Sequence, residues 1–275
     1  MKGFLPSLGV LLIPMLTQAQ DLSLKSVIQV LNGTQRGHHL IQESLKVWKL
    51  RTSTELLEKL QWGEASRTDT VLTRHYNPVT GAEEREQRVK IFLKQNQTYV
   101  EVALDFAHEL VHATHPSLFD PYDPKLTAAQ YIRTAIEGDG GEVEAVMAEC
   151  EVGFELSQKE PFANQRCQHY VHQQALSRDR VLKDFYQVGK WLSDLALRLG
   201  NEMSILPRLS SEDPLLYSST AHSPYPYALL KEFEAITEMA CKNSKIRMKT
   251  LHSDPLASGR EVEFLSRRCG QLKIL

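Results

Sequence analysis

The sequence has no long run of basic residues. Its 32 Lys and Arg are outnumbered by 34 Asp and Glu, and the formal net charge is -2. Nucleic acids and anionic membranes bind clustered Lys and Arg, so the sequence gives no support for either partner.

Long apolar runs are also missing once the N-terminus is passed. No later segment approaches the roughly 18 apolar residues that a membrane span requires, so we expect no span in the mature chain. Internal repeats and low-complexity tracts are absent as well. The 275 residues are 42% hydrophobic and 24% charged, which is typical of a globular protein. One elaborated domain or two closely packed lobes would fit this length.

The N-terminus, "MKGFLPSLGVLLIPMLTQAQ", is the exception. Lys2 precedes an apolar stretch from Phe4 to Leu16, and small or polar residues follow it. This layout is typical of a secretory signal peptide with cleavage after Ala19, so residues 1–19 are predicted to be removed. An uncleaved membrane anchor is the alternative. We therefore expect a secreted or periplasmic protein.

Cysteines are few, and none has the Cys-x-x-Cys spacing of a thiolate zinc site or a redox motif. The four residues Cys150, Cys167, Cys241 and Cys269 allow three complete pairings. Export favours disulfides, and we predict that sequence neighbours pair, because Cys150 with Cys167 and Cys241 with Cys269 would close short loops. Four free buried thiols are the alternative.

Hydrophobic periodicity predicts an α+β fold. A helical segment over 20–65 is followed by a core over 66–160 and by a mostly helical region over 161–275 that packs on the core. The core begins with three predicted strands in an antiparallel meander, at Thr68–Asn77, Glu86–Leu93 and Thr98–Leu104. The turn signals between them are Asn77–Gly81 and Asn96–Gln97. Later helices are predicted over 126–137, 142–157, 180–201 and 227–242.

The stretch "LDFAHELVHATHP" contains a His-Glu-x-x-His motif. We predict a helix over 106–115 with Asp105 as its N-terminal cap. Residues four apart lie on one helix face, so His108 and His112 can point their imidazoles at one ion. Imidazole is a favoured zinc ligand, and Glu109 beside it can take a proton from water. A chance pair of surface histidines is the alternative.

A catalytic zinc ion needs a third protein ligand and one open position. His115 lies on the same helix face, but a single straight stripe closes poorly around a tetrahedral ion, so we interpret it as a neighbour or a surface residue. On the predicted helix that begins at Glu142, the residues Glu142 and Glu149 fall on the apolar side. The opposite side carries an acidic stripe, predicted to be solvated, of Glu144, Glu151 and Glu155.

Two inward-facing carboxylates are costly unless they meet a cation. We therefore predict Glu142 as the third ligand and Glu149 as a residue that fixes a ligand histidine. Glu144 is the main rival for the ligand position, and Glu137 is a weaker one. The alternative is that Glu142 merely favours a helix N-terminus and that Glu149 pairs with an arginine.

His-Glu-x-x-His followed after about thirty residues by Glu-x-x-Ala, here "EVEA" from Glu142, resembles the gluzincin type of zinc metallopeptidase. The resemblance covers residues 85–157. It implies that Glu142 is a zinc ligand, that the preceding sheet packs on the active-site helix, and that an edge strand binds extended peptide. The chain departs from the thermolysin branch because it lacks an Asn before the ligand Glu, and because Val146 stands where that branch has an Asp.

The expected function is that of an exported zinc metallopeptidase acting on a peptide or protein substrate, with Glu109 as general base. A catalytically lapsed envelope or binding protein and a purely structural zinc are the alternatives. A donor to the developing oxyanion is expected from a later Tyr or His. The sequence does not rank the candidates, which are Tyr170, His169, His172, His222, Tyr225 and Tyr227.

Overall fold

The structure is a computed structural model, and it describes residues 23–76, 83–115, 119–218, 222–250 and 255–270. The predicted signal peptide and the predicted turn at 77–81 lie outside these ranges. The described chain is a mixed α+β fold with one small three-stranded sheet and many helices. None of the described helices is long and apolar enough to cross a membrane.

Two helices open the described chain, as the sequence predicts. α1 (Leu24–Asn32) and α2 (Gln35–Trp48) begin at Ser23 and Thr34, whose side chains accept hydrogen bonds from the first turn of each helix. A 3₁₀ helix, η1 (Ser53–Lys59), follows. The apolar faces of α1 and α2 pack on α3 and form part of the first hydrophobic cluster.

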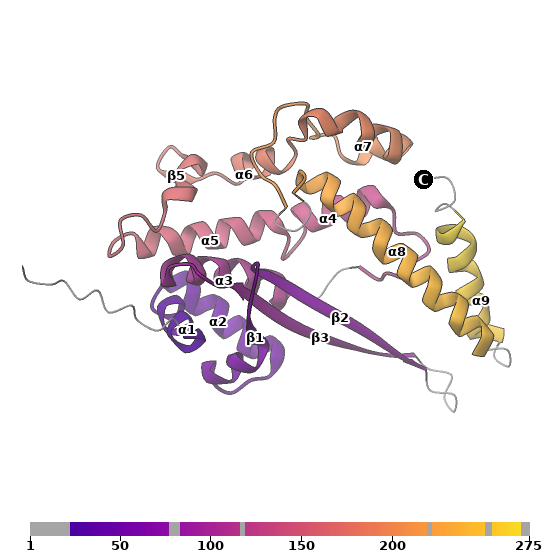
Figure 1. Cartoon of the computed structure of the whole chain (residues 1–275), viewed down its shortest axis with the longest axis horizontal. Coiled ribbons are helices and arrows are strands. Elements are labelled where there is room, and N and C mark those ends of the chain that lie inside the picture. Colours follow the sequence, from indigo (N-terminus) through magenta and orange to yellow (C-terminus); the bar gives the residue numbers. More distant parts are fainter. Residues whose placement is uncertain (1–22, 77–82, 116–118, 219–221, 251–254, 271–275) are drawn as a thin grey trace, which may run out of the picture.

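The sheet differs from the predicted meander. Its strands are β1 (Leu60–Gly63), β2 (Arg67–Tyr76) and β3 (Glu83–Lys94), in the order β1-β3-β2. β2 and β3 pair antiparallel as predicted, but β1 pairs parallel with β3 and occupies the end of the segment that was predicted to be helical. β2 and β3 continue as a long ribbon toward the far ends of α8 and α9 (Figure 1).

The predicted third strand, Thr98–Leu104, is wrong. These residues begin helix α3 (Tyr99–Thr114), which carries the motif. Thr98 and Glu101 form a capping box, in which each side chain bonds the other's backbone N–H, and this starts the helix seven residues before the predicted cap at Asp105. Asp105 is therefore an internal residue of a helix of 16 residues.

The next two helices confirm the predictions. α4 (Ala128–Glu137) and α5 (Glu142–Leu156) are joined by the turn Gly138–Gly141. α5 lies along α3, so that α3 is held between α5 and the α1–α2 pair (Figure 1).

The remaining chain is mostly helical. The predicted helix over 180–201 is two helices, because the chain turns at Gly189, whose φ of +53° favours glycine. The predicted helix over 227–242 is longer at both ends. The main elements are α6 (Arg178–Phe185), α7 (Leu192–Leu199), α8 (Tyr225–Thr250) and α9 (Pro255–Phe264). The short elements are η2 (Gln165–Tyr170), β4 (Val171–His172), β5 (Ala175–Leu176), η3 (Gly189–Trp191), η4 (Gly200–Ile205) and η5 (Leu265–Cys269).

Two hydrophobic clusters meet at α5. The first contains α1, α2, the sheet and α3, and the second contains α4, α6, α7 and the start of α8. Helix α5 contributes Ala148 and Val152 to the first cluster and Val143 to the second. The face of α3 that carries His108 and His112 therefore lies at the boundary between the two hydrophobic clusters.

Both predicted disulfides are confirmed. Cys150 pairs with Cys167 and Cys241 pairs with Cys269, and no free cysteine is left. The first disulfide joins α5 to η2, and the second joins α8 to η5. Two disulfides fit a chain that folds in an oxidising compartment outside the cytoplasm.

Candidate metal centre

Three side chains from α3 and α5 converge at the cluster boundary. His108 Nε2 lies 3.4 Å from Glu142 Oε2, and His112 Nε2 lies 3.8 Å from the same oxygen. One ligand atom from each of the three residues lies within 4.8 Å of the other two, which is close enough for all three to hold one metal ion. The structure thus brings His108, His112 and Glu142 together, as a shared ion would require.

The environment of Glu142 tests whether a cation fits. Its Oε2 atom is buried and makes no hydrogen bond. Burial raises the pKa of Glu142, but the charges of His112 and His108 outweigh burial and hold the pKa below its ordinary value. An ionised, buried oxygen without a hydrogen bond is costly unless a cation meets it, so the arrangement fits a metal ion between the three donors.

Each histidine is oriented by a contact at its other ring nitrogen. His112 Nδ1 lies 2.8 Å from the carbonyl oxygen of Gly140, which can only accept, so Nδ1 carries the proton. In the neutral ring this leaves the lone pair on Nε2, which faces Glu142. His108 Nδ1 lies 3.2 Å from Glu149 Oε2, so the predicted contact between Glu149 and a ligand histidine is present.

His108 also carries positive charge readily. Burial lowers the pKa of His108, but the adjacent carboxylates of Glu142 and Glu149 and the charge of Glu109 raise the pKa well above the ordinary value. Two carboxylates on one imidazole create a strongly negative local environment. A proton on His108 and a metal ion would compete for this environment.

Glu109 lies beside the ligand pair on α3 and points toward the sheet. The hydroxyl of Thr68, on β2, donates to its Oε2 at 2.8 Å and to its backbone carbonyl at 3.0 Å. Burial raises the pKa of Glu109, against the opposing charges of His108 and His112. A carboxylate with a raised pKa accepts a proton more readily at neutral pH, as a general base must.

The rival ligands have other partners. Glu144 Oε2 accepts a hydrogen bond from the backbone N–H of Gly140 at 2.8 Å, and so holds the turn that orients His112. His115 bonds the carbonyl of Val111 at 2.8 Å through Nδ1, and its ring packs against Gly140. None of these residues belongs to the three-residue group.

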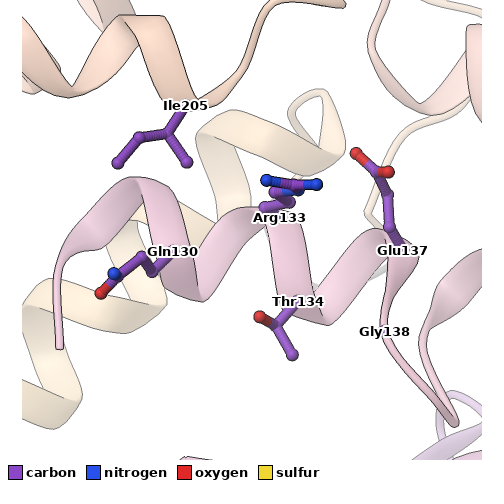
Figure 2. Close-up of a pocket in the computed structure, with 6 residues that line it drawn as sticks. All are labelled: Gln130, Arg133, Thr134, Glu137, Gly138 and Ile205. Atoms are coloured by element: carbon purple, nitrogen blue, oxygen red, sulfur yellow. The ribbon is translucent and has the colours of Figure 1, made fainter.

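Glu137, the weaker rival, lines a separate hollow of about 540 Å³ on the outer face of α4. Its Oε1 accepts a hydrogen bond of 2.6 Å from the hydroxyl of Tyr186. Figure 2 shows its carboxylate on the same side of the helix as Arg133 and Ile205. The residues that line this hollow include none of the three metal-site residues.

The acidic stripe of α5 is solvated only in part: Glu151 is exposed as predicted, whereas Glu144 and Glu155 are half-buried. Glu155 accepts hydrogen bonds from the backbone N–H groups of Gln35 and Arg36, the first two residues of α2. The Arg36 side chain also pairs with Glu151 at 3.0 Å. Carboxylates satisfy the free N–H groups at the start of a helix, so the stripe fastens α5 to α2.

Among the candidate oxyanion donors, Tyr225 is the one whose pKa is affected by the charges of Glu142, Glu109 and Glu149 together. The charge of Glu142, together with burial and the charges of Glu109 and Glu149, raises the pKa of Tyr225 well above its ordinary value. Its phenol therefore stays protonated and can donate a hydrogen bond. The ring is held by an edge-to-face contact with Phe185, with centroids 4.7 Å apart.

The other candidates have different surroundings. His169 pairs with Asp184 at 2.8 Å, and His172 lies 3.0 Å from an Arg180 nitrogen. Burial and the charges of Asp184 and Glu149 raise the pKa of Tyr170 to about 12. A hydrogen bond with Asp194 raises the pKa of Tyr227, which is half-buried.

Two residues that support the site do not follow from the motif. Thr68 comes from a strand 41 positions away from Glu109 in sequence. Arg166 contacts Glu149 Oε1 through Nε at 2.7 Å. The available signal for Arg166 was that it and Glu149 each directly adjoin one cysteine of the predicted Cys150–Cys167 pair.

No family model, curated protein or solved structure matches this chain. We therefore infer the function from the geometry of the site.

Proposed function

We propose that this chain is an exported zinc-dependent peptidase in which His108, His112 and Glu142 hold the metal ion. The observation that carries the proposal is the convergence of two imidazole Nε2 atoms on one buried carboxylate oxygen that makes no hydrogen bond. Two imidazoles and one carboxylate are a ligand set found in catalytic zinc sites of peptidases, and three protein ligands leave one position open. All four cysteines are in disulfides, so none supplies a fourth ligand.

When bound, zinc supplies Lewis acidity, which polarises a carbonyl and makes water acidic enough to attack it at neutral pH. Glu109 supplies the base: its carboxylate takes the proton of the attacking water and delivers it to the leaving amine. Thr68 holds one carboxylate oxygen and thereby fixes the direction in which the other can receive the proton. Burial raises the pKa of Glu109 and so favours this transfer.

Tyr225 is proposed as the donor to the oxyanion. Its phenol is close enough to Glu142, Glu109 and Glu149 for all three charges to act on it, and its raised pKa keeps the proton in place. A fixed neutral donor is suited to negative charge that develops only in the transition state. The contact with Phe185 limits the movement of the ring.

The gluzincin resemblance also proposes where an extended substrate binds. β2 pairs with β3 on one side, and no strand of the described chain pairs with its other edge. The start of β2 touches the active helix through Thr68 and Glu109. A peptide that adds to this edge would pass the proposed base.

The test compares three isosteric amide variants of the purified mature protein, with zinc per chain and turnover of a mixed peptide library as readouts. The parent should hold about one zinc per chain. Glu109→Gln should keep its zinc and lose about 10²- to 10⁴-fold in turnover. Glu142→Gln should lose most of its zinc. Glu144→Gln is the comparison from the same helix: its amide oxygen can still accept the hydrogen bond of Gly140, so this variant should retain both.

The outcomes separate the alternatives. A parent protein that stays free of zinc after zinc is resupplied would overturn the metal site. Zinc retained in Glu142→Gln but lost in Glu144→Gln would move the third ligand to Glu144. If the parent protein and Glu109→Gln both hold a full complement of zinc and neither hydrolyses the peptides, the chain is instead a catalytically lapsed binding protein.

A further inference from the structure

Arg166 joins two carboxylates that flank the metal site from opposite helices. Its Nε lies 2.7 Å from Glu149 Oε1 on α5, and its Nη2 donates to Asp105 Oδ1 on α3 at 3.1 Å. The carboxylates are largely buried, with side-chain exposures of 11% and 13%, whereas the Arg166 side chain is 45% exposed. The guanidinium thus covers a negatively charged seam between α3 and α5.

These contacts continue to the metal site in one direction and to the sheet in the other. Glu149 uses its second oxygen to hold His108 Nδ1 at 3.2 Å. Asp105 uses its second oxygen to accept a hydrogen bond of 2.6 Å from Ser66. Ser66 stands two residues before Thr68, which holds Glu109.

The result is a closed ring of contacts around one helix segment. It runs from His108 through Glu149, Arg166 and Asp105 to the start of β2, and returns through Thr68 to Glu109, the neighbour of His108. Among the side chains that form this ring, Arg166 is the permanently charged cation.

The Cys150–Cys167 disulfide fixes this arrangement in place. Cys150 follows Glu149 directly on α5, and Cys167 follows Arg166 directly on η2. Both sulfur-bearing residues are buried. Arg166 lies in a short 3₁₀ helix. Without the disulfide, so short a helix would fix the position of the Arg166 side chain only weakly.

We propose that Arg166 is a positioning residue: clamped by the disulfide, it holds Glu149 against His108 and so sets the affinity of the metal site. The inference rests on the proposed metal site and names a determinant of its strength. Without the guanidinium, Glu149 and Asp105 lose the cation between them, and repulsion favours rotation of Glu149 toward solvent. His108 then loses the partner that orients its ring.

The experiment measures zinc affinity of Arg166→Met by competition with a chromophoric chelator. Removing the support of a ligand histidine weakens metal binding about 10- to 100-fold, and we expect a loss of that size. Arg36→Met is the matched control, because Arg36 is similarly exposed, at 38%, and pairs with Glu151 on the same helix but has no contact with His108. It should change zinc affinity less than about threefold.

A double-variant cycle identifies the route of the effect. If Arg166 acts through Glu149, adding Arg166→Met to Glu149→Gln should change zinc affinity less than about threefold. The visible spectrum of the cobalt-substituted protein provides a second readout, because it responds to the orientation of the imidazole ligands. Arg166→Met and Glu149→Gln should shift it alike, and Arg36→Met should leave it unchanged.

Two results would overturn the inference while leaving the proposed function intact. One is Arg166→Met with the affinity and spectrum of the parent. The other is a loss that adds fully to that of Glu149→Gln, which would indicate a general structural role. If Arg166→Met does not fold, Arg166→Lys serves in its place, with a smaller loss because one charge contact remains. Failure of the parent itself to bind zinc would overturn both proposals.

Discussion

The two disulfides allow a comparison in which loss of stability and loss of metal affinity should separate. Cys150–Cys167 adjoins the side chains that hold His108, whereas Cys241–Cys269 joins α8 to the C-terminal segment. The second bond lies in a small cluster of its own with Phe264. Replacing each pair by two alanines removes one covalent link at a time.

The expected cost in stability follows from the lengths of the loops. The cysteines of the two pairs are separated by 17 and 28 positions. The entropy of closing loops of this length in the unfolded chain corresponds to about 3.1 and about 3.6 kcal/mol. Such losses lower the melting temperature of a chain of this size by about 6–14 °C.

The assay combines thermal unfolding of the metal-free protein with chelator competition for zinc at a temperature at which both variants are folded. We expect similar decreases in melting temperature for the two variants. Zinc affinity should fall about 10- to 100-fold in Cys150→Ala/Cys167→Ala, because Arg166 is no longer tied to Glu149. It should stay within about threefold of the parent in Cys241→Ala/Cys269→Ala.

Equal losses of zinc affinity in both variants would refute the reasoning, because the effect would then follow overall stability. Unchanged affinity in Cys150→Ala/Cys167→Ala would show that the guanidinium needs no covalent clamp.

Three further substitutions probe other parts of the site. Gly140→Ala should lower the free energy of unfolding, measured by urea denaturation, by at least about 1–2 kcal/mol. The φ of Gly140 is +72°, and a Cβ at this position would lie 2.3 Å from the Cβ of His115. Thr68→Val should lower kcat about 10- to 100-fold at unchanged zinc content, because it removes the hydrogen bond that orients Glu109. A hydrogen bond to a charged group is worth about 1.5–3 kcal/mol. An unchanged kcat would contradict that role. Tyr225→Phe should lower kcat about 10²- to 10³-fold, with little change in KM or zinc content; a change confined to KM would instead place the phenol in substrate binding.

The metal-site geometry could be predicted because it depends on two local regularities. The spacing of His108 and His112 places both on one face of any helix, and the spacing of Glu142 and Glu149 does the same on α5. An inward carboxylate needs a cation, and this argument identified Glu142 without knowledge of the fold. The disulfide pairing could also be predicted, because pairing each cysteine with its neighbour in the sequence closes the shortest loops.

The errors lie where local sequence satisfies two patterns. "TYVEVAL" alternates like a strand, yet Val100, Ala103, Leu104 and Ala107 also recur at helical spacing. The capping box at Thr98 and Glu101, together with burial of the apolar face, decides for the helix. The parallel pairing of β1 with β3 joins residues about thirty positions apart, and no local signal encodes it.

Residues that support the site were missed for a related reason. Thr68 and Arg166 reach it through tertiary contacts, so they bear no fixed spacing to the motif. Tyr225 was one of six candidates, and only the combined effect of the Glu142, Glu109 and Glu149 charges on its phenol distinguishes it. A motif can thus predict the residues of a candidate ion site more readily than the residues that orient them.

The attachment of α2 to α5 bears on whether the N-terminal helices could be removed after folding. Removal of residues 24–48 by proteolysis would uncover the apolar face of α3 and leave Glu151 and Glu155 without their partners on α2. Helix α5, which carries Glu142, would lose one of its supports. We therefore expect these helices to remain in the mature protein as a permanent part of the fold, and not to act as a detachable pro-segment.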